Sequence, residues 1–394
     1  MKTSAVASAA PKGLPDRRLK VAVLNRIFSA TGGGAERYSI ALVEQLAAKH
    51  EIHVFAQEIN HAWPGVTYHT IACGFKKPRW LNQLWYAYAA WRVTRRGFDI
   101  VHSHENVWHG QVQTIHVKTI QRSLYEGRKG LRWSLRWLKI LLSPRLITYM
   151  LLERRRMSAR KGVIVVAVSP ALQDELCEQY PKAQPQMRVV TPGVAWPAQA
   201  ITQVQARQLL GVPAEGQYVL FVANDYTRKG LTTLLQALHG LDAVHLLVVG
   251  HGGQIERYQT LARSLGVQNR VHFLGLLQDM GVAYSAAQVL AHPTLEDSFA
   301  MVVLEAMAYG LPVIVSSGQY CGIASLLTHH VHALILKDPQ DAQALLQALK
   351  NILSDKLLAS ALNQAAQVFA QQHSWQSAAL AYDAMYKELA QAAS

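Results

Sequence analysis

The stretch His292–Ser317, which reads HPTLEDSFAMVVLEAMAYGLPVIVSS, decides the fold of this chain. The residues just before it, Gln288–Ala291 (QVLA), form a short apolar run that is typical of a buried parallel strand. Val313–Val315 predicts a second strand of the same kind. Because loop and helix signals lie between the two runs, the stretch predicts a strand–loop–helix–strand unit of an α/β protein.

The helix inside this stretch has clear signals at both ends. Asp297 or Ser298 is expected to cap its start, and Phe299–Tyr309 supplies good helix formers. Gly310 suits the left-handed position after a helix, and Pro312 prevents the helix from continuing. A loop that opens a helix at the carboxyl end of a parallel strand presents free N–H groups, so we expect an anion site suited to phosphate.

Two carboxylates, Asp297 and Glu305, flank this expected anion site. Carboxylates do not bind phosphate, but they accept hydrogen bonds from hydroxyl groups. The pair is therefore expected to contact hydroxyls, as on a ribose or a hexose, beside the phosphate.

A glycine-rich turn follows the first predicted strand, Leu19–Asn25. Gly33 and Gly34 allow the backbone to approach a ligand closely, and a helix through about Ala48 begins near Glu36. The sequence is neither a dinucleotide-binding fingerprint nor a Walker A motif. The turn is expected to accommodate phosphate, with a tight turn that binds nothing as the alternative.

The second half of the chain begins again with a strand, Tyr218–Ala223, and then Asn224-Asp-Tyr-Thr-Arg-Lys-Gly before a helix. Arg228 and Lys229 place two cations beside free helix N–H groups, which suits a pyrophosphate. The alternative is a solvated surface turn.

A histidine pair ends another predicted strand, Asp99–His104. Strand alternation places His102 and His104 on the same face. With Glu105 next to them a metal site is conceivable, but no third ligand is evident, so no metal is expected.

The segment that contains Asp297 and Glu305 resembles the E-x7-E region of retaining glycosyltransferases of family 4, which have the two-domain GT-B fold. The resemblance implies that the first acid contacts the donor sugar and that Glu305 contacts the nucleotide ribose. The first acid is Asp297, where the family usually has Glu, with Glu296 beside it as the alternative. Ser298 and Ala300 stand where the family often has Gly.

The resemblance extends to the other motifs. It implies that Gly33 and Gly34 lie between donor phosphate and acceptor, and that His104, with His102 in reserve, projects toward the sugar. Asn224 stands where the family usually has Arg, a departure that resembles the lipopolysaccharide-core glucosyltransferase branch. The implied catalytic residues are His104, Asp297, Glu296, Lys229 and Arg228; the implied donor-binding residues are Gly33, Gly34, Asn224, Arg228, Lys229, Leu276, Ser298, Phe299, Ala300, Met301 and Glu305.

Strands alternate with helices in both halves, which predicts two doubly wound, Rossmann-like domains facing a cleft. We expect a loose tail over residues 1–18, an acceptor and membrane-facing domain over 19–194, and a nucleotide-sugar domain over 195–375. Residues 376–394 are expected to form a helix that crosses back to the first domain, as the resemblance implies.

Charge is distributed unevenly along the chain. Residues 1–200 carry 29 Lys and Arg against 12 Asp and Glu, whereas residues 201–394 carry 10 against 13. The basic half predicts a polyanionic partner. Residues 76–97 and 127–161 combine cations with Trp and Leu, and Arg132, Arg136 and Lys139 share one helical face. This pattern favours an anionic membrane interface, with a core-packed helix as the alternative.

The three cysteines are far apart and odd in number, so a reducing compartment is expected. No apolar run is long enough for a transmembrane helix. The chain is therefore expected in the cytoplasm, peripheral on the inner face of the membrane.

The expected function is transfer of a hexose, with glucose first, from a UDP-sugar to a lipopolysaccharide core or another membrane-linked glycan, with no cofactor or metal. A GT-B UDP-sugar 2-epimerase is the alternative enzyme. A non-enzymatic polyanion or nucleic-acid binder is the alternative class, and the cleft motifs argue against it because such a binder needs no pyrophosphate site.

Overall fold

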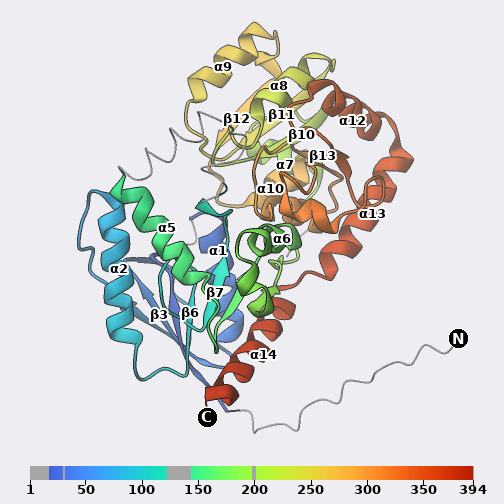
Figure 1. Cartoon of the computed structure of the whole chain (residues 1–394). Helices are drawn as coiled ribbons and strands as arrows, with labels where there is room; N and C mark the ends of the chain where they lie inside the picture. Colours follow the sequence, from blue (N-terminus) through green and yellow to red (C-terminus); the bar gives the residue numbers. More distant parts are fainter. Residues whose placement is uncertain (1–16, 30–31, 121, 123–142, 198–200, 394) are drawn as a thin grey trace, which may run out of the picture.

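The computed structural model describes residues 17–29, 32–120, 122, 143–197 and 201–393. Two α/β domains, each built around a parallel sheet with helices on both faces, lie one above the other (Figure 1). The domains meet at the carboxyl ends of their strands. The contacts Arg37–Glu305, Ser169–Ser298 and Lys118–Gln319 all join residues of the loops and helix starts that follow these strands. This architecture confirms the predicted pair of Rossmann-like domains facing a cleft.

The first domain holds a sheet of strand order β5-β3-β1-β6-β7-β8-β9 over the described residues, with a short β2–β4 pair beside it. Its strands are β1 (Lys20–Leu24), β2 (Ile27–Ser29), β3 (Glu51–Ala56), β4 (Glu58–Asn60), β5 (Val66–Thr70), β6 (Ile100–Ser103), β7 (Val112–Ile115), β8 (Ile164–Ala167) and β9 (Met187–Val189). Its helices are α1 (Gly34–Leu46), α2 (Arg79–Thr94), α5 (Pro144–Arg156), α6 (Pro170–Gln179) and the 3-10 turn η1 (Pro181–Gln186).

The second domain has the strand order β12-β11-β10-β13-β14-β15 over the described residues. Its strands are β10 (Gln217–Val222), β11 (Val244–Val249), β12 (Val271–Gly275), β13 (Val289–His292), β14 (Val313–Ser316) and β15 (Leu334–Leu336). Its helices are α7 (Gln203–Leu210), α8 (Leu231–His239), α9 (Ile255–Ser264), α10 (Met280–Ala286), α11 (Met301–Ala308), α12 (Ala342–Ser354) and α13 (Lys356–Gln371), with 3-10 turns η2 (Gln268–Arg270) and η3 (Gly322–Leu326).

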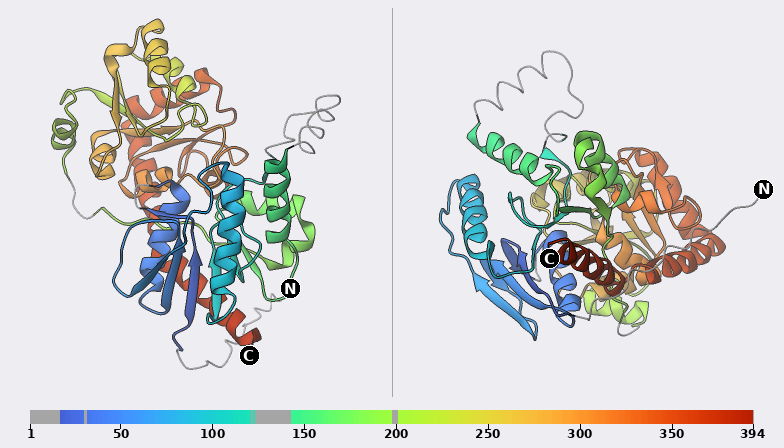
Figure 2. Two further views of the ribbon diagram at one scale, coloured as in Figure 1. Left: turned by 90° about the vertical axis from the view of Figure 1, so that its left-hand side faces the viewer. Right: turned by 60° about the horizontal axis from the view of Figure 1, so that its bottom comes forward.

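The last helix, α14 (Trp375–Ala393), returns from the second domain and packs against α1 of the first (Figures 1 and 2). A buried polar chain anchors it: the Tyr382 hydroxyl lies 3.0 Å from that of Tyr38 and 2.8 Å from Oγ1 of Thr114, and His102 contacts Tyr386 at 2.6 Å. Buried hydroxyls and imidazoles need such partners, so α14 completes the core of the first domain.

Most predicted strands are present, and the differences have physical causes. The sequence reading missed β7, because its polar Gln113 and Thr114 interrupt the apolar run, although both are buried and hydrogen-bonded. Residues 339–372 are expected to be helical, and they form α12 and α13, which are separated where Asp355 caps the start of α13. Arg132, Arg136 and Lys139 lie outside the described residues.

The structure also bears on the expected absence of disulfide bonds and of a transmembrane helix. Cys73, Cys177 and Cys321 carry free thiols. Among the described residues, no helix is both long and apolar enough to cross a bilayer.

Candidate active site in the interdomain cleft

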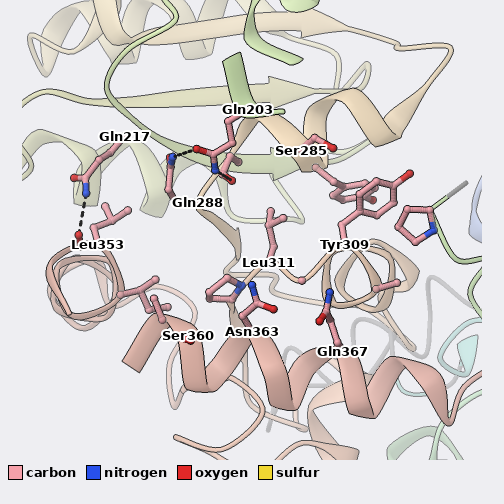
Figure 3. Close-up of a pocket in the computed structure, with 18 of the residues that line it drawn as sticks. Gln203, Gln217, Ser285, Gln288, Tyr309, Leu311, Leu353, Ser360, Asn363 and Gln367 are labelled. Atoms are coloured by element: carbon pink, nitrogen blue, oxygen red, sulfur yellow. Dashed lines mark hydrogen bonds between the residues drawn. The ribbon is translucent and has the colours of Figure 1, made fainter. Parts of the chain in front are cut away.

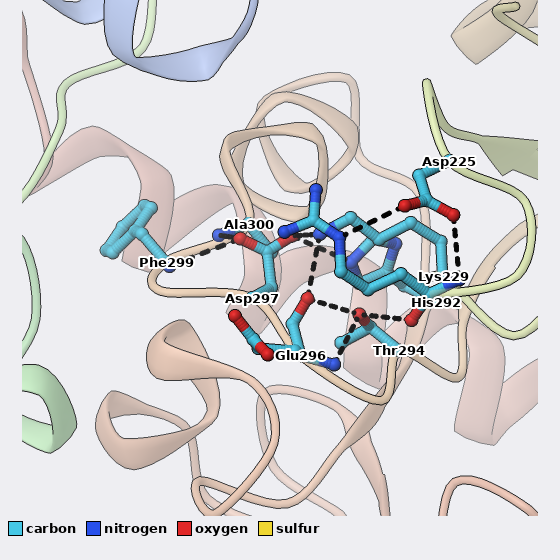
Figure 4. A network of polar contacts seen from close by, with 9 residues as sticks. Asp225, Lys229, His292, Thr294, Glu296, Asp297, Phe299 and Ala300 are labelled. Atoms are coloured by element: carbon cyan, nitrogen blue, oxygen red, sulfur yellow. Dashed lines mark hydrogen bonds and ion pairs between the residues drawn. The ribbon is translucent and has the colours of Figure 1, made fainter. Parts of the chain in front are cut away.

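An ion pair between Lys229 and Asp297 joins the loop after β10 to the loop after β13 (Figure 4). Nζ of Lys229 also donates to the backbone carbonyl of Glu296 at 3.1 Å. Both side chains are mostly buried, with 12% of Lys229 and 19% of Asp297 exposed. The predicted phosphate-binding lysine and the predicted sugar-binding acid are therefore in direct contact.

Asp297 also organises the loop that follows it. Its Oδ1 accepts the backbone N–H of Ala300 at 2.9 Å and that of Phe299 at 3.3 Å. The expected helix start at Phe299 is wrong: α11 begins at Met301, after Ala300 in the left-handed region with φ 75°. The carboxylate satisfies N–H groups of the turn rather than of the first helical turn, and this leaves the start of α11 open toward the cleft.

The charge state of Asp297 follows from its neighbours. Burial by itself raises the pKa of a carboxyl group, but here Lys229 and the His292 imidazole at 3.2 Å hold the pKa of Asp297 well below its usual range. Burial lowers the pKa of His292. Asp297 is thus an anion and His292 a neutral hydrogen-bonding partner at physiological pH.

The other predicted residues of the loop between β10 and α8 lie near Lys229 and Asp297. Gly230 must be glycine, because it has φ 82° and an added Cβ would lie 2.0 Å from the carbonyl oxygen of Pro293. Arg228 is half exposed, with its Nε 3.6 Å from Asp225, and Asn224 is exposed. The Glu296 side chain lies beside Asp297 with its carboxylate turned away from Lys229 (Figure 4).

Glu305 occupies a different part of the cleft. Its Oε1 accepts from Nη2 of Arg37 at 2.6 Å, and its Oε2 accepts from the Tyr284 hydroxyl at 2.6 Å. Arg37 belongs to α1 of the first domain, so this ion pair crosses the cleft. Sequence reasoning missed Arg37 and Tyr284, because nothing in their local sequence shows that they meet Glu305.

Two cavities open along the cleft, and each is lined by residues of both domains. One, of about 240 Å³, is lined by Arg37, Asp279, Tyr284, Met301 and Glu305 among others. The other, of about 360 Å³, is lined on the first-domain side by Lys118, Arg122, Ser169, Asp174 and Glu175, and on the second by Asp297, Ser298 and Gly318–Tyr320. Each carboxylate of the predicted pair therefore borders its own cavity.

Direct contacts hold the two domains together around these cavities. The Ser169 hydroxyl, which caps α6, donates to the carbonyl of Ser298 at 2.7 Å. An added Cβ on Gly34 would lie 3.9 Å from Sδ of Met301, so the glycine-rich turn faces the start of α11. Gly33 is the residue that caps α1. The predicted phosphate-accommodating elements of both domains thus converge.

Three histidines lie at the carboxyl ends of β6 and β7. His102 is fully engaged, with Tyr386 on Nδ1 and Thr114 on Nε2 at 2.7 Å. The His104 ring packs against His102 and Tyr38, and its Nδ1 lies 2.9 Å from Nε2 of His116. Its buried Nε2 has no hydrogen-bond partner among the described residues. Of the predicted pair, His104 has the free nitrogen and His102 is a structural group.

His116 was not predicted, because the strand before it was missed. It lies just after β7, stacks on His104 at 5.2 Å and is more exposed than His104. Burial, together with the charge of Arg156, lowers the pKa of His116 to about 3, and burial and the neighbouring histidines also lower that of His104. Both imidazoles are neutral, so a single proton lies in the hydrogen bond between them.

Two predicted donor residues lie outside the polar centre. Leu276 is 72% exposed at the end of β12, and Phe299 is buried. A third cavity, of about 650 Å³, is surrounded by side-chain amides such as Gln203, Gln288 and Gln367 (Figure 3). It borders the start of β10 and the residues just before β13 and β14, so it lies at the sheet edge opposite the cleft. Ligands of open parallel sheets bind at the carboxyl ends of the strands, so the cleft rather than this cavity is the candidate active site.

We expect Lys229→Met to destabilise the second domain by about 2 kcal/mol at pH 7.5, less than the roughly 3–5 kcal/mol of a fully buried pair. In the wild type the pKa of Asp297 in the folded state is depressed. The contribution of the pair to the free energy of unfolding is therefore complete above the unfolded-state pKa of about 3.9, and it is lost as the pH falls through the folded-state pKa. In the variant the carboxylate is unpaired and its pKa rises. Urea unfolding at pH 7.5 and 4.5 measures the loss, which should shrink at the lower pH. Lys229→Met with Asp297→Asn is the matched control and should recover stability; an equal loss at both pH values would contradict the pairing.

Comparison with known proteins agrees with the division of the chain into two α/β domains. The family described as Glycosyltransferase Family 4 matches residues 32–195, and that described as Glycosyl transferases group 1 matches residues 203–369. Together the two matches cover both domains.

Individual relatives are distant. A D-inositol 3-phosphate glycosyltransferase of Corynebacterium urealyticum is 31% identical over 229 residues, which is 54% of this chain and 53% of the relative. The lipopolysaccharide glucosyltransferase WaaG of Escherichia coli K12 is 29% identical over 169 residues, 42% of this chain and 44% of the relative. The aligned stretches therefore span about half the length of these relatives.

Solved structures resemble nearly the whole chain. WaaG superposes with a TM-score of 0.79 at 20% identity, over 92% of this chain and 98% of that one. Anabaena HepE in complex with UDP and glucose gives 0.74 at 19% identity, over 94% and 100%. On the two family matches and the shared architecture, the chain belongs to the family 4 and group 1 glycosyltransferases of GT-B fold.

Proposed function

We propose that this protein is a retaining glycosyltransferase that transfers a hexose, glucose in the first instance, from a UDP-sugar to a membrane-linked glycan such as a lipopolysaccharide core. One observation carries the proposal: Lys229, the open start of α11 and the glycine-rich turn converge in a cleft that has a carboxylate on either side. This is the set of groups that a nucleoside diphosphate sugar requires.

The diphosphate would lie between the glycine-rich turn and the start of α11. Lys229 and Arg228 supply positive charge there, and the backbone N–H groups of α11 supply further donors. Glu305 would accept the ribose hydroxyls, and Asp297 or Glu296 the sugar hydroxyls. Asp297 would first release one of the four protein groups that its two oxygens contact. Because these charges are fixed in place before reaction, they stabilise the leaving diphosphate without reorganisation.

In a retaining reaction on one face of the sugar, the bond between the anomeric carbon and the β-phosphate oxygen breaks. The acceptor hydroxyl oxygen forms the new bond to that carbon from the same side. Its proton passes to the released phosphate oxygen, so no separate base is required. His104, with its free Nε2, would bond a sugar hydroxyl and hold the ring in place.

The names of similar proteins support the choice of donor and acceptor. WaaG is named as a lipopolysaccharide glucosyltransferase, and HepE was solved with UDP and glucose. Other relatives are named for inositol phosphate or mannose transfer, so the acceptor rests on the basic first domain.

An exposed surface on α2 and α5 that combines apolar side chains with cations supports a membrane-linked acceptor. The two helices pack side by side (Figure 1). Trp85 and Tyr88 of α2 are exposed, as is Leu151 of α5, which is 60% exposed. Exposed cations lie on or just after the same two helices: Arg92, Arg95 and Arg96 at α2, and Arg154 and Arg155 on α5. Apolar groups flanked by Arg suit an anionic bilayer surface, and we propose a location on the inner face of the cytoplasmic membrane.

A transfer assay tests the proposed reaction. We expect label from UDP-[14C]glucose to enter extracted core lipopolysaccharide, and the product to keep the α configuration of the donor. EDTA should leave the rate unchanged, because protein cations meet the diphosphate charge and the described residues include no group of three metal-binding side chains. Conversion of the donor to a 2-epimer without acceptor would favour the epimerase, and binding without chemistry would favour the polyanion binder.

The two strand histidines should behave differently. His104→Ala should lower kcat by about 10- to 100-fold with little change in UDP affinity, because the side chain is placed near the sugar. His102→Ala should instead destabilise the first domain by about 1–3 kcal/mol, since it leaves Tyr386 and Thr114 unpaired. Steady-state kinetics, calorimetry with UDP and thermal unfolding separate these effects; a silent His104→Ala would remove His104 from the site.

The membrane surface can be tested by charge reversal. Arg92→Glu, Arg96→Glu and Arg154→Glu together should abolish co-sedimentation with phosphatidylglycerol vesicles, because each cation near the surface contributes about 1 kcal/mol. Wild-type binding should fall as salt rises.

A matched variant makes the same charge change in the other domain, with Arg257, Arg263 and Lys350 changed to Glu. It should still bind the vesicles. Equal loss in both variants would indicate a general charge effect, and binding to neutral vesicles would contradict the electrostatic part of the proposal.

A further inference from the structure

The interdomain ion pair between Arg37 and Glu305 calls for a function beyond stability. It joins α1 to α11 across the cleft with a charged hydrogen bond of 2.6 Å. Arg37 is 40% exposed and Glu305 only 13%, so the pair lies at the boundary between the cleft and its interior. A half-exposed ion pair contributes little to folding stability. Its effect on the orientation of Glu305 is therefore the more important property.

Glu305 is fixed from two directions. Arg37 holds Oε1 from the first domain, and the buried Tyr284 hydroxyl holds Oε2 from α10 of the second. Each carboxylate oxygen has two lone-pair sites, so each retains one. One acceptor site therefore remains on each oxygen, and two acceptor sites are what the 2′ and 3′ hydroxyls of a ribose require.

The pair also forms part of a cavity wall. Arg37 and Glu305 line the cavity of about 240 Å³ together with Asp279 and Met301. Ala41 of α1, the interdomain segment Gly193–Ala195 and Trp375 complete it, so both domains contribute walls. A ligand enclosed here is enclosed only while the domains are together.

We propose that Arg37 is a positioning residue for the nucleotide ribose: it orients Glu305 toward the sugar diol and closes the nucleoside end of the donor site from the first domain. The inference rests on the proposed function, since it assumes a nucleoside diphosphate donor. Because Arg37 belongs to the first domain and Glu305 to the second, ribose recognition then depends on closure of the two domains. Binding of the nucleotide and closure of the cleft stabilise each other.

Calorimetry with UDP, GDP and ADP and their 2′-deoxy counterparts tests the proposal on the full chain. We expect the wild type to bind the preferred ribonucleotide about tenfold more tightly than its deoxy form, as expected when a hydrogen bond to a charged group is lost. Arg37→Ala should weaken ribonucleotide binding about fivefold, at the low end of coupling between sites. The deoxynucleotide should be nearly unaffected, so the discrimination falls to about twofold.

Control variants separate positioning from charge and from folding. Arg37→Lys keeps the charge without the planar fork and should retain part of the discrimination. Tyr284→Phe removes the contact on the other oxygen and should also reduce it. Arg263→Ala, on α9 away from the cleft, should behave like the wild type. Thermal unfolding should be unchanged in Arg37→Ala, because Ala is a good helix former at an exposed position.

The outcomes are distinct. Equal weakening of ribo- and deoxyribonucleotides in Arg37→Ala would show that Arg37 acts through charge on the diphosphate, and would overturn the inference. Tighter ribonucleotide binding in Arg37→Ala would show that Arg37 competes with the ribose, and would overturn it as well. If the wild type bound none of the three diphosphates, the proposed function itself would fail and the inference with it.

Discussion

The ion pair between Lys229 and Asp297 is the interaction on which the catalytic half of this molecule depends. It ties two loops that come from neighbouring strands of the sheet, β10 and β13. We expect the pair to contribute about 2 kcal/mol, because the cost of taking both charges out of water offsets part of their attraction. That energy holds Asp297 where it supports the left-handed Ala300 and thereby directs the start of α11 into the cleft.

The same pair sets the electrostatic state of the resting site. Lys229 is neutralised by Asp297, so its full charge is not presented to an incoming phosphate. In the proposed function, a diphosphate would add a second anion to the one that Lys229 already contacts, and the lysine would bridge the ligand and the loop. Glu305, held at both oxygens on the other side of the cleft, shows the same principle of a functional group fixed by protein partners before any ligand arrives.

Most of the fold follows from the sequence, because strands, the glycine turn and helix starts have local signals. The same signals select several of the residues that line the cleft, such as Asp297 and Glu305. The start of α11 was misplaced because Asp297 takes its partners from the turn and from Lys229, far away in sequence. Strand β7 and His116 were missed because the polar side chains of the strand find partners on α5 and α14. Arg37 and Tyr284 could not be found at all, since only the folded chain brings them to Glu305.

The route of α14 has a consequence for how the chain is made. The core of the first domain is complete only when Tyr382 and Tyr386 reach Tyr38, Thr114 and His102. Synthesis runs from the amino end, so residues 375–393 are made after the strands of both sheets. The core of the first domain therefore stays incomplete until α14, which follows the whole second domain in the chain, has been made.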